Sequence, residues 1–327
     1  MATPEIVYRP LGRCGTKVSV YGLGGWTTFG HSVSDEDTIR SIIRVAFDAG
    51  INFFDTADIY AKGACERAMG KALADFPRSE LVLSTKLFWP MSDDVNDRGL
   101  SRKHIMESVE KSLERFGTDY FDIYFCHRFD PETPFEETAR AMDDLVRQGK
   151  VLYWGTSEWT GPQIAAAHEA CRDRNLYAPQ VEQPQCSLLY RGKFEHSVRP
   201  VAEALGMGLV LWSPLASGIL TGKYDDGVPP DSRLGQIEWL RDEILTEENV
   251  GRARAFAGIA KKMGCSRAQL ALAWARSQRG VSSVILGATS VAQLEENLQS
   301  LSVEIDERVA AELNEAFPVK PWIDKEG

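Results

Sequence analysis

Hydrophobic and polar positions alternate along this chain in a regular order. A short apolar or β-branched run is followed by a segment with helical periodicity, and the pair recurs roughly every 30 residues, the spacing of a βα unit. Runs that are apolar on both faces are typical of parallel strands packed between a filled barrel and outer helices. Eight runs predict strands, at residues 18–24, 51–55, 81–86, 121–127, 151–157, 179–183, 209–213 and 284–287.

Capping residues mark where the predicted helices begin and end. Ser101 precedes a segment with apolar residues at spacing four, and Gly117 follows it, which predicts a capped helix with a glycine end. Ser290 and Gln293 have the spacing of a reciprocal capping box ahead of another helix. Further helical patterns cover residues 133–147, 249–263 and 267–277.

Two features depart from the simple βα repeat. Residues 7–11 and 17–19 flank a glycine-containing turn and predict a hairpin ahead of the first barrel strand. Residues 218–235, after the seventh strand, are rich in Gly, Pro and Asp, and a long loop within a compact domain is usually functional. No change in composition marks a second domain. We therefore expect residues 1–327 to form one (β/α)₈ barrel with an N-terminal β-hairpin and a long loop after strand seven.

Composition and charge exclude several classes of protein. Hydrophobic residues make up 43% of the chain and charged residues 26%, which favours a packed core over disorder. The formal net charge of −10 disfavours binding to nucleic acid or to an anionic membrane surface. The first ten residues lack the apolar core of a signal peptide, so we expect a cytoplasmic protein. The six cysteines form no C-x-x-C pair, and we expect no metal.

Polar residues gather where neighbouring strands end. Asp55 closes the second predicted strand, Tyr60 follows it, Lys86 closes the third and His127 the fourth. Each residue alone has a simpler explanation: a helix cap, a packed ring, a surface lysine or a hydrogen-bonded histidine. In this fold, however, catalytic residues lie at the C-terminal ends of the strands. The four residues on consecutive strand ends therefore predict an active site.

These four residue types suit proton transfer to a carbonyl oxygen. A free tyrosine has a pKa of about 10, which makes it a poor acid at neutral pH. An ammonium about 4 Å away would lower that pKa by about 3 units, before the opposing effect of burial. We therefore expect Lys86 to bring the pKa of Tyr60 closer to neutrality, with Asp55 holding Lys86 charged and His127 orienting the carbonyl.

Carbonyl reduction also needs a hydride, which no side chain supplies, so a cofactor is required. No G-x-G-x-x-G motif follows a strand, and no P-loop is present. We therefore expect the phosphates of a dinucleotide at the ends of strands seven and eight, near the helix that begins at Ser290. Lys223 and Arg233 supply charge there, and we expect the loop at residues 218–235 to fold over the cofactor and limit its release.

The motifs together resemble the aldo-keto reductase family over nearly the whole chain. The resemblance is closest to the branch of potassium-channel β subunits and their bacterial relatives. The family motifs are GLGGW at 22–26, FDTA at 54–57 with Tyr60, STK at 84–86, HR at 127–128, WGTS at 154–157, WSPL at 212–215, and LGAT at 286–289 with Glu296 and Asn297. Those of the branch are SRKH at 101–104, YWGTS at 153–157, and GKY at 222–224 with Gly227 and PP at 229–230.

The resemblance implies a function and a set of site residues. It implies an NADPH-dependent oxidoreductase that reduces aldehydes or ketones, with Asp55, Tyr60, Lys86 and His127 as the catalytic tetrad. We expect Trp26 and Trp89 to line the substrate pocket with Tyr60 and His127, and Tyr190 to lie near them. The implied cofactor contacts are Gly25, Trp26, Asp55, Ser157, Gln183, Trp212, Ser213, Pro214, Leu215, Ala216, Gly218, Lys223, Arg233, Gly287, Thr289, Gln293, Glu296 and Asn297.

Two departures from the family pattern bear on this interpretation. Channel β subunits carry Asn and Arg where this chain has His127 and Glu158, so His127 favours a working reductase. Many family members place Lys and Arg where this chain has Gly287 and Gln293. Recognition of the adenosine 2′-phosphate of NADPH then depends largely on Lys223 and Arg233.

Two other functions stay open at the level of sequence. One is a Schiff-base aldolase, which would need Lys86 as a neutral nucleophile. The other is a redox-sensing subunit of a larger assembly that holds the cofactor and turns over slowly. The aromatic pocket favours small aldehydes and aryl ketones, while the physiological substrate and a homo-oligomeric state are left undetermined.

Overall fold

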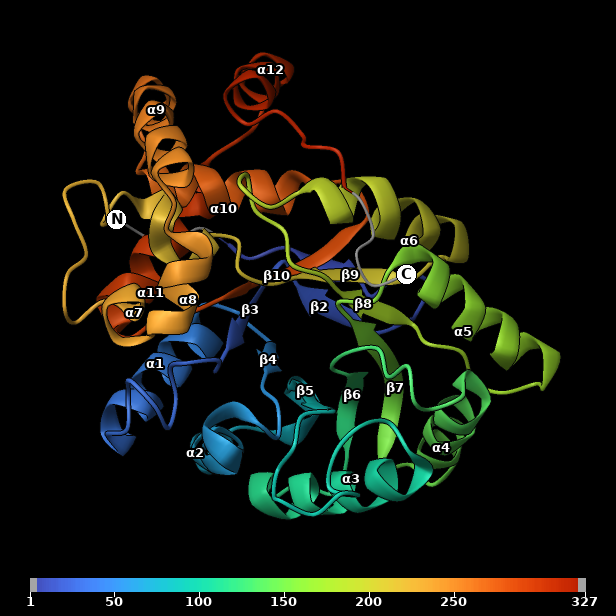
Figure 1. Ribbon diagram of the computed structural model, residues 1–327. Helices are drawn as coiled ribbons and strands as arrows, with labels where there is room; N and C mark the ends of the chain where they lie inside the picture. The colour runs from blue at the N-terminus through green and yellow to red at the C-terminus, as the bar shows by residue number, and fades with distance from the viewer. Residues whose placement is uncertain (1–4, 323–327) are drawn as a thin grey trace.

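The computed structural model describes residues 5–322. Eight parallel strands close into a barrel in the order β10-β3-β4-β5-β6-β7-β8-β9, and helices surround it (Figure 1). This confirms the predicted (β/α)₈ fold, with each predicted strand present and its ends shifted by a few residues. The barrel strands are β3 (Tyr21–Gly24), β4 (Phe53–Asp55), β5 (Val82–Leu87), β6 (Phe121–Cys126), β7 (Val151–Ser157), β8 (Val181–Gln183), β9 (Gly208–Leu211) and β10 (Val281–Leu286).

Twelve α-helices and several shorter helical turns connect the strands within the described range. The α-helices are α1 (Glu36–Asp48), α2 (Ala64–Leu73), α3 (Arg102–Phe116), α4 (Phe135–Arg147), α5 (Gly161–Asp173), α6 (Arg199–Leu205), α7 (Arg233–Gln236), α8 (Glu238–Ile244), α9 (Glu247–Met263), α10 (Arg267–Ser277), α11 (Val291–Leu298) and α12 (Glu307–Ala316). The shorter turns are η1 (Tyr60–Gly63), η2 (Arg78–Glu80), η3 (Phe194–Val198), η4 (Ala216–Thr221) and η5 (Gln299–Ser302). None of the helices in residues 5–322 combines the length and apolar character that crossing a bilayer requires.

The predicted hairpin closes the N-terminal end of the barrel. Strands β1 (Tyr8–Pro10) and β2 (Lys17–Ser19) pair antiparallel. Leu11, which follows β1, and Val18 of β2 are fully buried and belong to the core inside the barrel. The predicted strand at residues 18–24 is therefore divided, because its first residues belong to the hairpin and only the remainder enters the barrel.

Alternation along the strands separates two cores. One set of apolar side chains fills the barrel interior, and the intervening residues pack between the barrel and the helices. Because successive side chains point to opposite faces, the residue two positions beyond an interior residue also faces inward, one layer closer to the C-terminal end. The strand residues of the interior core are Phe53, Val82, Ile123, Phe125, Val181, Val210 and Ile285.

The caps that the sequence predicts are present at both ends of α3, whereas the predicted capping box of α11 is present only in part. The Ser101 hydroxyl accepts a hydrogen bond from the His104 N–H at 3.2 Å, and Gly117 ends α3 in the left-handed region, as predicted. Ser290 caps α11 by accepting from the Gln293 N–H at 3.2 Å. The second hydrogen bond of the predicted capping box, from the Ser290 N–H to the Gln293 side chain, is not formed. The Gln293 Oε1 accepts instead from the N–H and hydroxyl of Thr289, so this part of the prediction is wrong.

The segment after β9 is more ordered than a loop. It contains η4 and α7, and α8, which the sequence did not predict, follows directly. The hydroxyl of the buried Tyr224 donates to the Ser217 carbonyl at 3.4 Å and accepts from the Leu234 N–H at 3.3 Å. Asp225 forms an ion pair with Arg267 of α10 at 2.7 Å. The hydrogen bonds of Tyr224 join the two limbs of the segment to each other, and the ion pair attaches the segment to α10.

Candidate active site

A pocket of about 500 Å³ opens at the C-terminal ends of the barrel strands. It extends from the ends of β4, β5 and β6 to the segments that follow β9 and β10. Most of the residues expected from sequence line it. They are Trp26, Asp55, Tyr60, Trp89, His127, Ser157, Gln183, Trp212, Ser213, Pro214, Leu215, Gly218, Lys223, Arg233, Gly287, Thr289, Gln293 and Asn297.

Five expected residues lie outside this lining. Lys86 is fully buried and contacts the lining residues Asp55 and Tyr60 from behind the pocket wall. Gly25 packs against α2, where an added Cβ would come within 2.2 Å of the Cys65 sulfur. Ala216 is buried beside its neighbour Ser217, which does line the pocket. Glu296 is exposed. The Tyr190 hydroxyl accepts a hydrogen bond from the Asn249 side chain instead of facing the pocket.

Lys86 is the centre of the polar cluster at the bottom of the pocket. It is fully buried, as expected for the third residue of the interior-facing series that begins at Val82. Its Nζ lies 2.6 Å from the Asp55 Oδ2, 2.7 Å from the Thr56 carbonyl oxygen and 3.3 Å from the Tyr60 hydroxyl. Three acceptors therefore occupy the three protons of its ammonium group.

Asp55 is held by three side chains from two strands. Its Oδ2 pairs with Lys86 of β5, while its Oδ1 accepts from the Ser84 hydroxyl at 2.6 Å and from the Gln183 amide of β8 at 3.1 Å. Asp55 and Lys86 are 5% and 0% exposed. A buried ion pair tolerates the loss of hydration only when its remaining hydrogen-bonding capacity is satisfied, and here it is.

The backbone that follows Tyr60 has an unusual conformation. Ala61 and Lys62 have φ values of 48° and 49°, and Gly63 follows at 82°. Side chains other than glycine rarely occupy this left-handed region, and such conformations concentrate at functional sites. The turn η1 thus directs Tyr60 back towards the strand ends instead of continuing directly into α2.

The charge states of the cluster follow mainly from burial. Burial raises the pKa of Tyr60 well above its usual value, and the nearby Asp55 carboxylate raises it further. Burial lowers the pKa of Lys86, against the effect of Asp55. The expectation that Lys86 brings the Tyr60 pKa towards neutrality is therefore wrong, because desolvation of the phenolate has the larger effect. Tyr60 holds its proton firmly at neutral pH.

His127 lies beside Tyr60, two positions beyond the interior residue Phe125. Its ring centroid is 5.8 Å from that of Tyr60 in an edge-to-face arrangement. Burial, followed by the charges of Arg128 and Lys86, keeps the His127 pKa well below its usual value, so the ring is neutral. Its buried Nδ1 has no hydrogen-bond partner among residues 5–322.

At the other end of the pocket, two cations lie together without acidic partners. Neither Lys223 nor Arg233 forms an ion pair with a carboxylate in the described part of the chain. Burial and the neighbouring Arg233 lower the pKa of Lys223, and burial lowers that of Arg233. Lys223 stays exposed and Arg233 is partly buried, and because two adjacent positive charges repel each other, this end of the pocket favours an anion.

Trp212 lies between the polar cluster and these cations. Its indole N–H donates to the Glu158 Oε1 at 2.9 Å, and Lys193 lies 3.2 Å from the other oxygen of that carboxylate. Trp26 meets Trp212 edge to face at 5.7 Å between ring centroids. Glu158, where channel β subunits carry Arg, thus fixes an aromatic wall of the pocket.

The chemistry along the pocket fits a dinucleotide. One end holds the polar cluster, the middle has aromatic walls, and the far end has two cations beside the first turn of α11. Ser213, Ser217 and Gly218 line the wall between them with φ values of 55°, 54° and 97°. These positive φ values turn the backbone sharply at the wall of the pocket.

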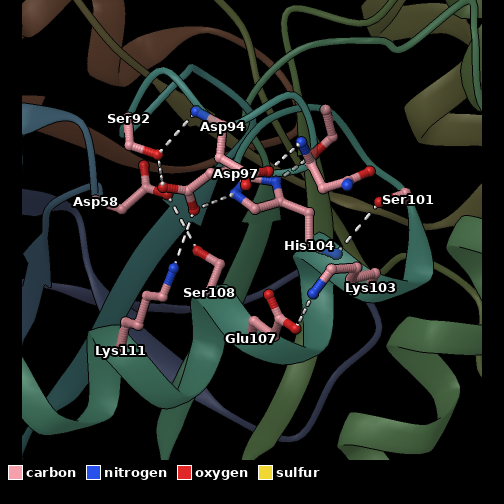
Figure 2. A network of polar contacts seen from close by, with 12 residues as sticks. Asp58, Ser92, Asp94, Asp97, Ser101, Lys103, His104, Glu107, Ser108 and Lys111 are labelled. Atoms are coloured by element: carbon pink, nitrogen blue, oxygen red, sulfur yellow. Dashed lines mark hydrogen bonds and ion pairs between the residues drawn. The ribbon is translucent and has the colours of Figure 1, made fainter.

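The loop after β5 brings Trp89 to the rim of the pocket, and Figure 2 shows how its distal part is attached to α3. Asp97 accepts from the Ser92 hydroxyl at 2.7 Å and pairs with Lys111 of α3 at 3.0 Å (Figure 2). Burial keeps the His104 pKa low, and its Nδ1–H donates to the Gly99 carbonyl at 2.9 Å. The loop is therefore held by side chains from two turns of one helix.

Several lining residues were not identified from sequence. Arg128 belongs to the HR motif at 127–128, but the family resemblance gave it no role in the site. Trp239 lies on α8, a helix that was not predicted. Gly24, Leu286 and Ala288 belong to the GLGGW and LGAT motifs, but no role was assigned to them. The other lining residues were not singled out by any motif. They are Thr28, Ile59, Ser217, Thr221, Asp231, Ser232, Leu272 and Ile285.

Comparisons with known proteins agree with this geometry. The family described as "Aldo/keto reductase family" matches residues 21–317. A probable voltage-gated potassium channel subunit beta of Oryza sativa subsp. japonica is 45% identical over 90% of this chain and 91% of its own length. The protein of the same description from Arabidopsis thaliana is 44% identical over the same shares. A putative subunit of this kind from Schizosaccharomyces pombe is 42% identical over 94% and 91%.

Proposed function

Because the chain belongs to the aldo/keto reductase family, we propose that it reduces aldehydes or ketones to alcohols with a nicotinamide cofactor, and that Tyr60 donates the proton. Members of this family typically bind NAD(P)H. The observation that carries the proposal is the position of Lys86, whose buried ammonium contacts both the Asp55 carboxylate and the Tyr60 hydroxyl, two groups that line the pocket.

Each residue of the cluster has a role that follows from its charge state. The cofactor, when bound, supplies the hydride. Tyr60 holds a proton at neutral pH and transfers it to the carbonyl oxygen as negative charge develops there. The Lys86 ammonium, 3.3 Å from the phenol oxygen, stabilises the phenolate that forms. The neutral His127 donates a hydrogen bond that orients the carbonyl, and Asp55 keeps Lys86 in place.

NADPH is the cofactor that the charges favour over NADH. The adenosine 2′-phosphate adds negative charge that NADH lacks, and the unpaired cations Lys223 and Arg233 would contact it. Gly287 and Gln293, at positions where many family members carry cations, add no charge. We therefore assign the preference to Lys223 and Arg233 alone.

The relatives suggest a second candidate function. Their descriptions name a subunit of a potassium channel, which favours a cofactor-binding partner that turns over slowly. His127 in place of the Asn of channel subunits favours catalysis. The Schiff-base aldolase is disfavoured, because a nucleophilic Lys86 would have to leave Asp55, Thr56 and Tyr60, the three acceptors that hold its protons.

The test compares wild type with Tyr60→Phe on a panel of aldehydes and aryl ketones, using NADPH and NADH. We expect wild type to turn over steadily, and Tyr60→Phe to lose about 100-fold or more in kcat because the general acid is absent. NADPH affinity, measured by fluorescence titration, should stay close to wild type.

Tyr8→Phe is the matched control, because that hydroxyl bonds the Gly50 carbonyl at the opposite end of the barrel. It should leave turnover unchanged. Near-normal turnover in Tyr60→Phe would remove Tyr60 from the mechanism. A single fast turnover followed by negligible steady-state activity in wild type would favour the slow cofactor-binding subunit.

A further inference from the structure

Arg128 lies in the pocket next to the proposed catalytic residues, and the roles described so far do not use it. It follows His127 at the end of β6, and its guanidinium carbon is 5.5 Å from the centre of the Trp89 ring. Its Nη1 donates to the His127 carbonyl oxygen at 2.5 Å. Two neighbours thus fix the plane of the guanidinium in the substrate end of the pocket.

The guanidinium has unused donors and no acidic partner. Arginine carries five N–H donors, of which the His127 carbonyl takes one. Within residues 5–322, Arg128 forms no ion pair, in contrast to Arg78, which pairs with Asp122. In a chain of net charge −10, an unpaired cation in a pocket is available to an anionic ligand.

Arg128 is too distant in the barrel to serve the cofactor phosphates. In the closed strand order, β6 lies directly across the barrel from β10 and three strands away from β9. Lys223 and Arg233 belong to the segment after β9, beside the strand that leads into α11. The two groups of cations therefore lie on different sides of the pocket and can bind two different anions.

Hydrogen bonds hold in place the two segments that position Arg128, the one after β6 and the loop that carries Trp89. Asp130, two residues further on, accepts from the Leu100 N–H at 2.7 Å and from the Thr133 hydroxyl at 2.8 Å. Leu100 ends the loop that carries Trp89, which the contacts in Figure 2 hold on α3. Because the loop and the segment after β6 are joined, the indole and the guanidinium keep one relative position without a ligand.

We propose that Arg128 binds an anionic group of the carbonyl substrate, a carboxylate above all, so that this chain prefers acidic aldehydes and ketones to neutral ones. The inference rests on the proposed carbonyl reduction. Arg128 is then a specificity-determining residue, because it contacts the part of the substrate that does not react. The guanidinium binds a carboxylate in a bidentate manner, and Trp89 packs against an adjoining aromatic or aliphatic part.

The test uses pairs of substrates that differ only in charge: 2-, 3- and 4-formylbenzoate and their methyl esters, with Arg128→Gln. In wild type we expect a higher kcat/KM for at least one formylbenzoate than for its ester, and the best isomer reports the reach of Arg128. In the variant this preference should fall about ten- to hundredfold, mainly through KM, as expected for a charge-assisted contact. Arg128→Lys should restore part of it.

Arg308→Gln is the matched control, since Arg308 lies on α12, is 71% exposed and pairs with Glu312. It removes the same charge at a distance from the pocket and should leave the preference as in wild type. If Arg128 acted only by supporting His127 and Tyr60, Arg128→Gln would slow the acid and the ester equally. An unchanged ratio would therefore overturn the proposal.

A binding measurement separates this inference from the proposed function. Benzoate carries the anion but no reducible carbonyl, and its binding can be followed by quenching of tryptophan fluorescence. We expect benzoate to bind wild type at least ten times more tightly than Arg128→Gln. Equal binding would overturn the anion site even in an active reductase. Arg128-dependent binding without turnover of any carbonyl would instead overturn the proposed reduction and retain the anion site.

Discussion

At the scale of single residues, the proposed site is a continuation of the packing inside the barrel. Asp55, Lys86 and His127 take the inward direction of the apolar residues that precede them on their strands. The last inward position has no apolar layer above it, so polar groups there face the pocket. Tyr60 differs, because it reaches the cluster through a strained turn instead of a strand.

Lys223 and Arg233 give a prediction at this scale. Lys223→Met and Arg233→Met should each weaken NADPH binding about ten- to hundredfold, because each removes a charge-assisted contact of about 1.5–3 kcal/mol to the 2′-phosphate. NADH binding should change much less. Fluorescence titration with both cofactors measures this.

Lys103→Met serves as the control, since Lys103 lies on the exposed surface of α3 and pairs with Glu107. Equal losses for NADPH and NADH in the two pocket variants would show that these cations do not read the 2′-phosphate. They would then serve the phosphates that both cofactors share.

At the scale of elements, we expect the segment between β9 and α8 to control how the cofactor enters and leaves. The sequence predicted a loop that covers the cofactor, and the structure places Lys223, Ser232 and Arg233 of this segment along the pocket. Tyr224 and Leu234 are buried, so the limbs of the segment are anchored to the barrel. Any opening motion therefore has to break contacts outside the pocket, of which the ion pair of Asp225 with Arg267 is the clearest.

Asp225→Asn should therefore release NADPH faster than wild type. A partly buried ion pair of this kind contributes about 1 kcal/mol, which corresponds to a rise in the release rate of about fivefold. Stopped-flow fluorescence measures the rate, with Trp212 as the reporter in the pocket wall.

The control for Asp225→Asn is Glu238→Gln, whose side chain is 80% exposed and pairs with Arg241 on α8. It should leave release unchanged. A release rate in Asp225→Asn equal to that of wild type would mean that this segment does not gate the pocket.

At the scale of the whole molecule, charge is distributed unevenly. The chain is acidic, yet the pocket exposes Arg128, Lys223 and Arg233, which lack acidic partners among the described residues. The unpaired cations make the electrostatic potential in the pocket positive, so the pocket attracts anionic ligands although the net charge of the protein is negative. Elsewhere the barrel buries acids: burial raises the pKa of both Asp58 and Glu182 to about 8.

These acids should make stability decrease with rising pH. The usual pKa of Glu is 4.5, so between pH 5 and 8 folded Glu182 keeps a proton that the unfolded chain has lost. The unfolded state then binds fewer protons, and the free energy of unfolding falls by at most about 1.4 kcal/mol per pH unit for each such group. This loss of stability is absent below the pKa that the acid has in the unfolded chain, and it is complete above the pKa that the acid has in the folded protein.

Glu182→Gln should reduce that slope, because the amide does not titrate and can keep the hydrogen bond with Thr156. Urea denaturation at a series of pH values measures it. Glu304→Gln, at an exposed position, should leave the slope as in wild type. Parallel curves for wild type and Glu182→Gln would show that Glu182 is ionised in the folded protein.

The element order and the residues of the proposed tetrad could be identified from the sequence, because both depend on local patterns. Strand and helix periodicity, capping residues such as Ser101, and polar residues at the ends of apolar runs are written in consecutive positions. The errors also have local causes. The Gln293 side chain accepts a hydrogen bond from Thr289 and not from the Ser290 N–H that the capping-box spacing predicts. The strand predicted at residues 18–24 is divided because the same pattern of apolar residues fits both a hairpin strand and a barrel strand.

Tertiary structure alone decided what depends on distance through space. The direction of the Tyr60 pKa reflects how much of the phenol is desolvated, and no spacing along the chain measures that. Arg128 became a candidate only when the structure showed its guanidinium beside Trp89 and without an acidic partner in the described residues. The sequence by itself determined which side chains at the strand ends point into the barrel, because alternation is a property of consecutive residues. Folding decided the charge states of these side chains and which of them have a hydrogen-bond or ion-pair partner, because burial and Coulomb interactions sum over residues far apart in the chain.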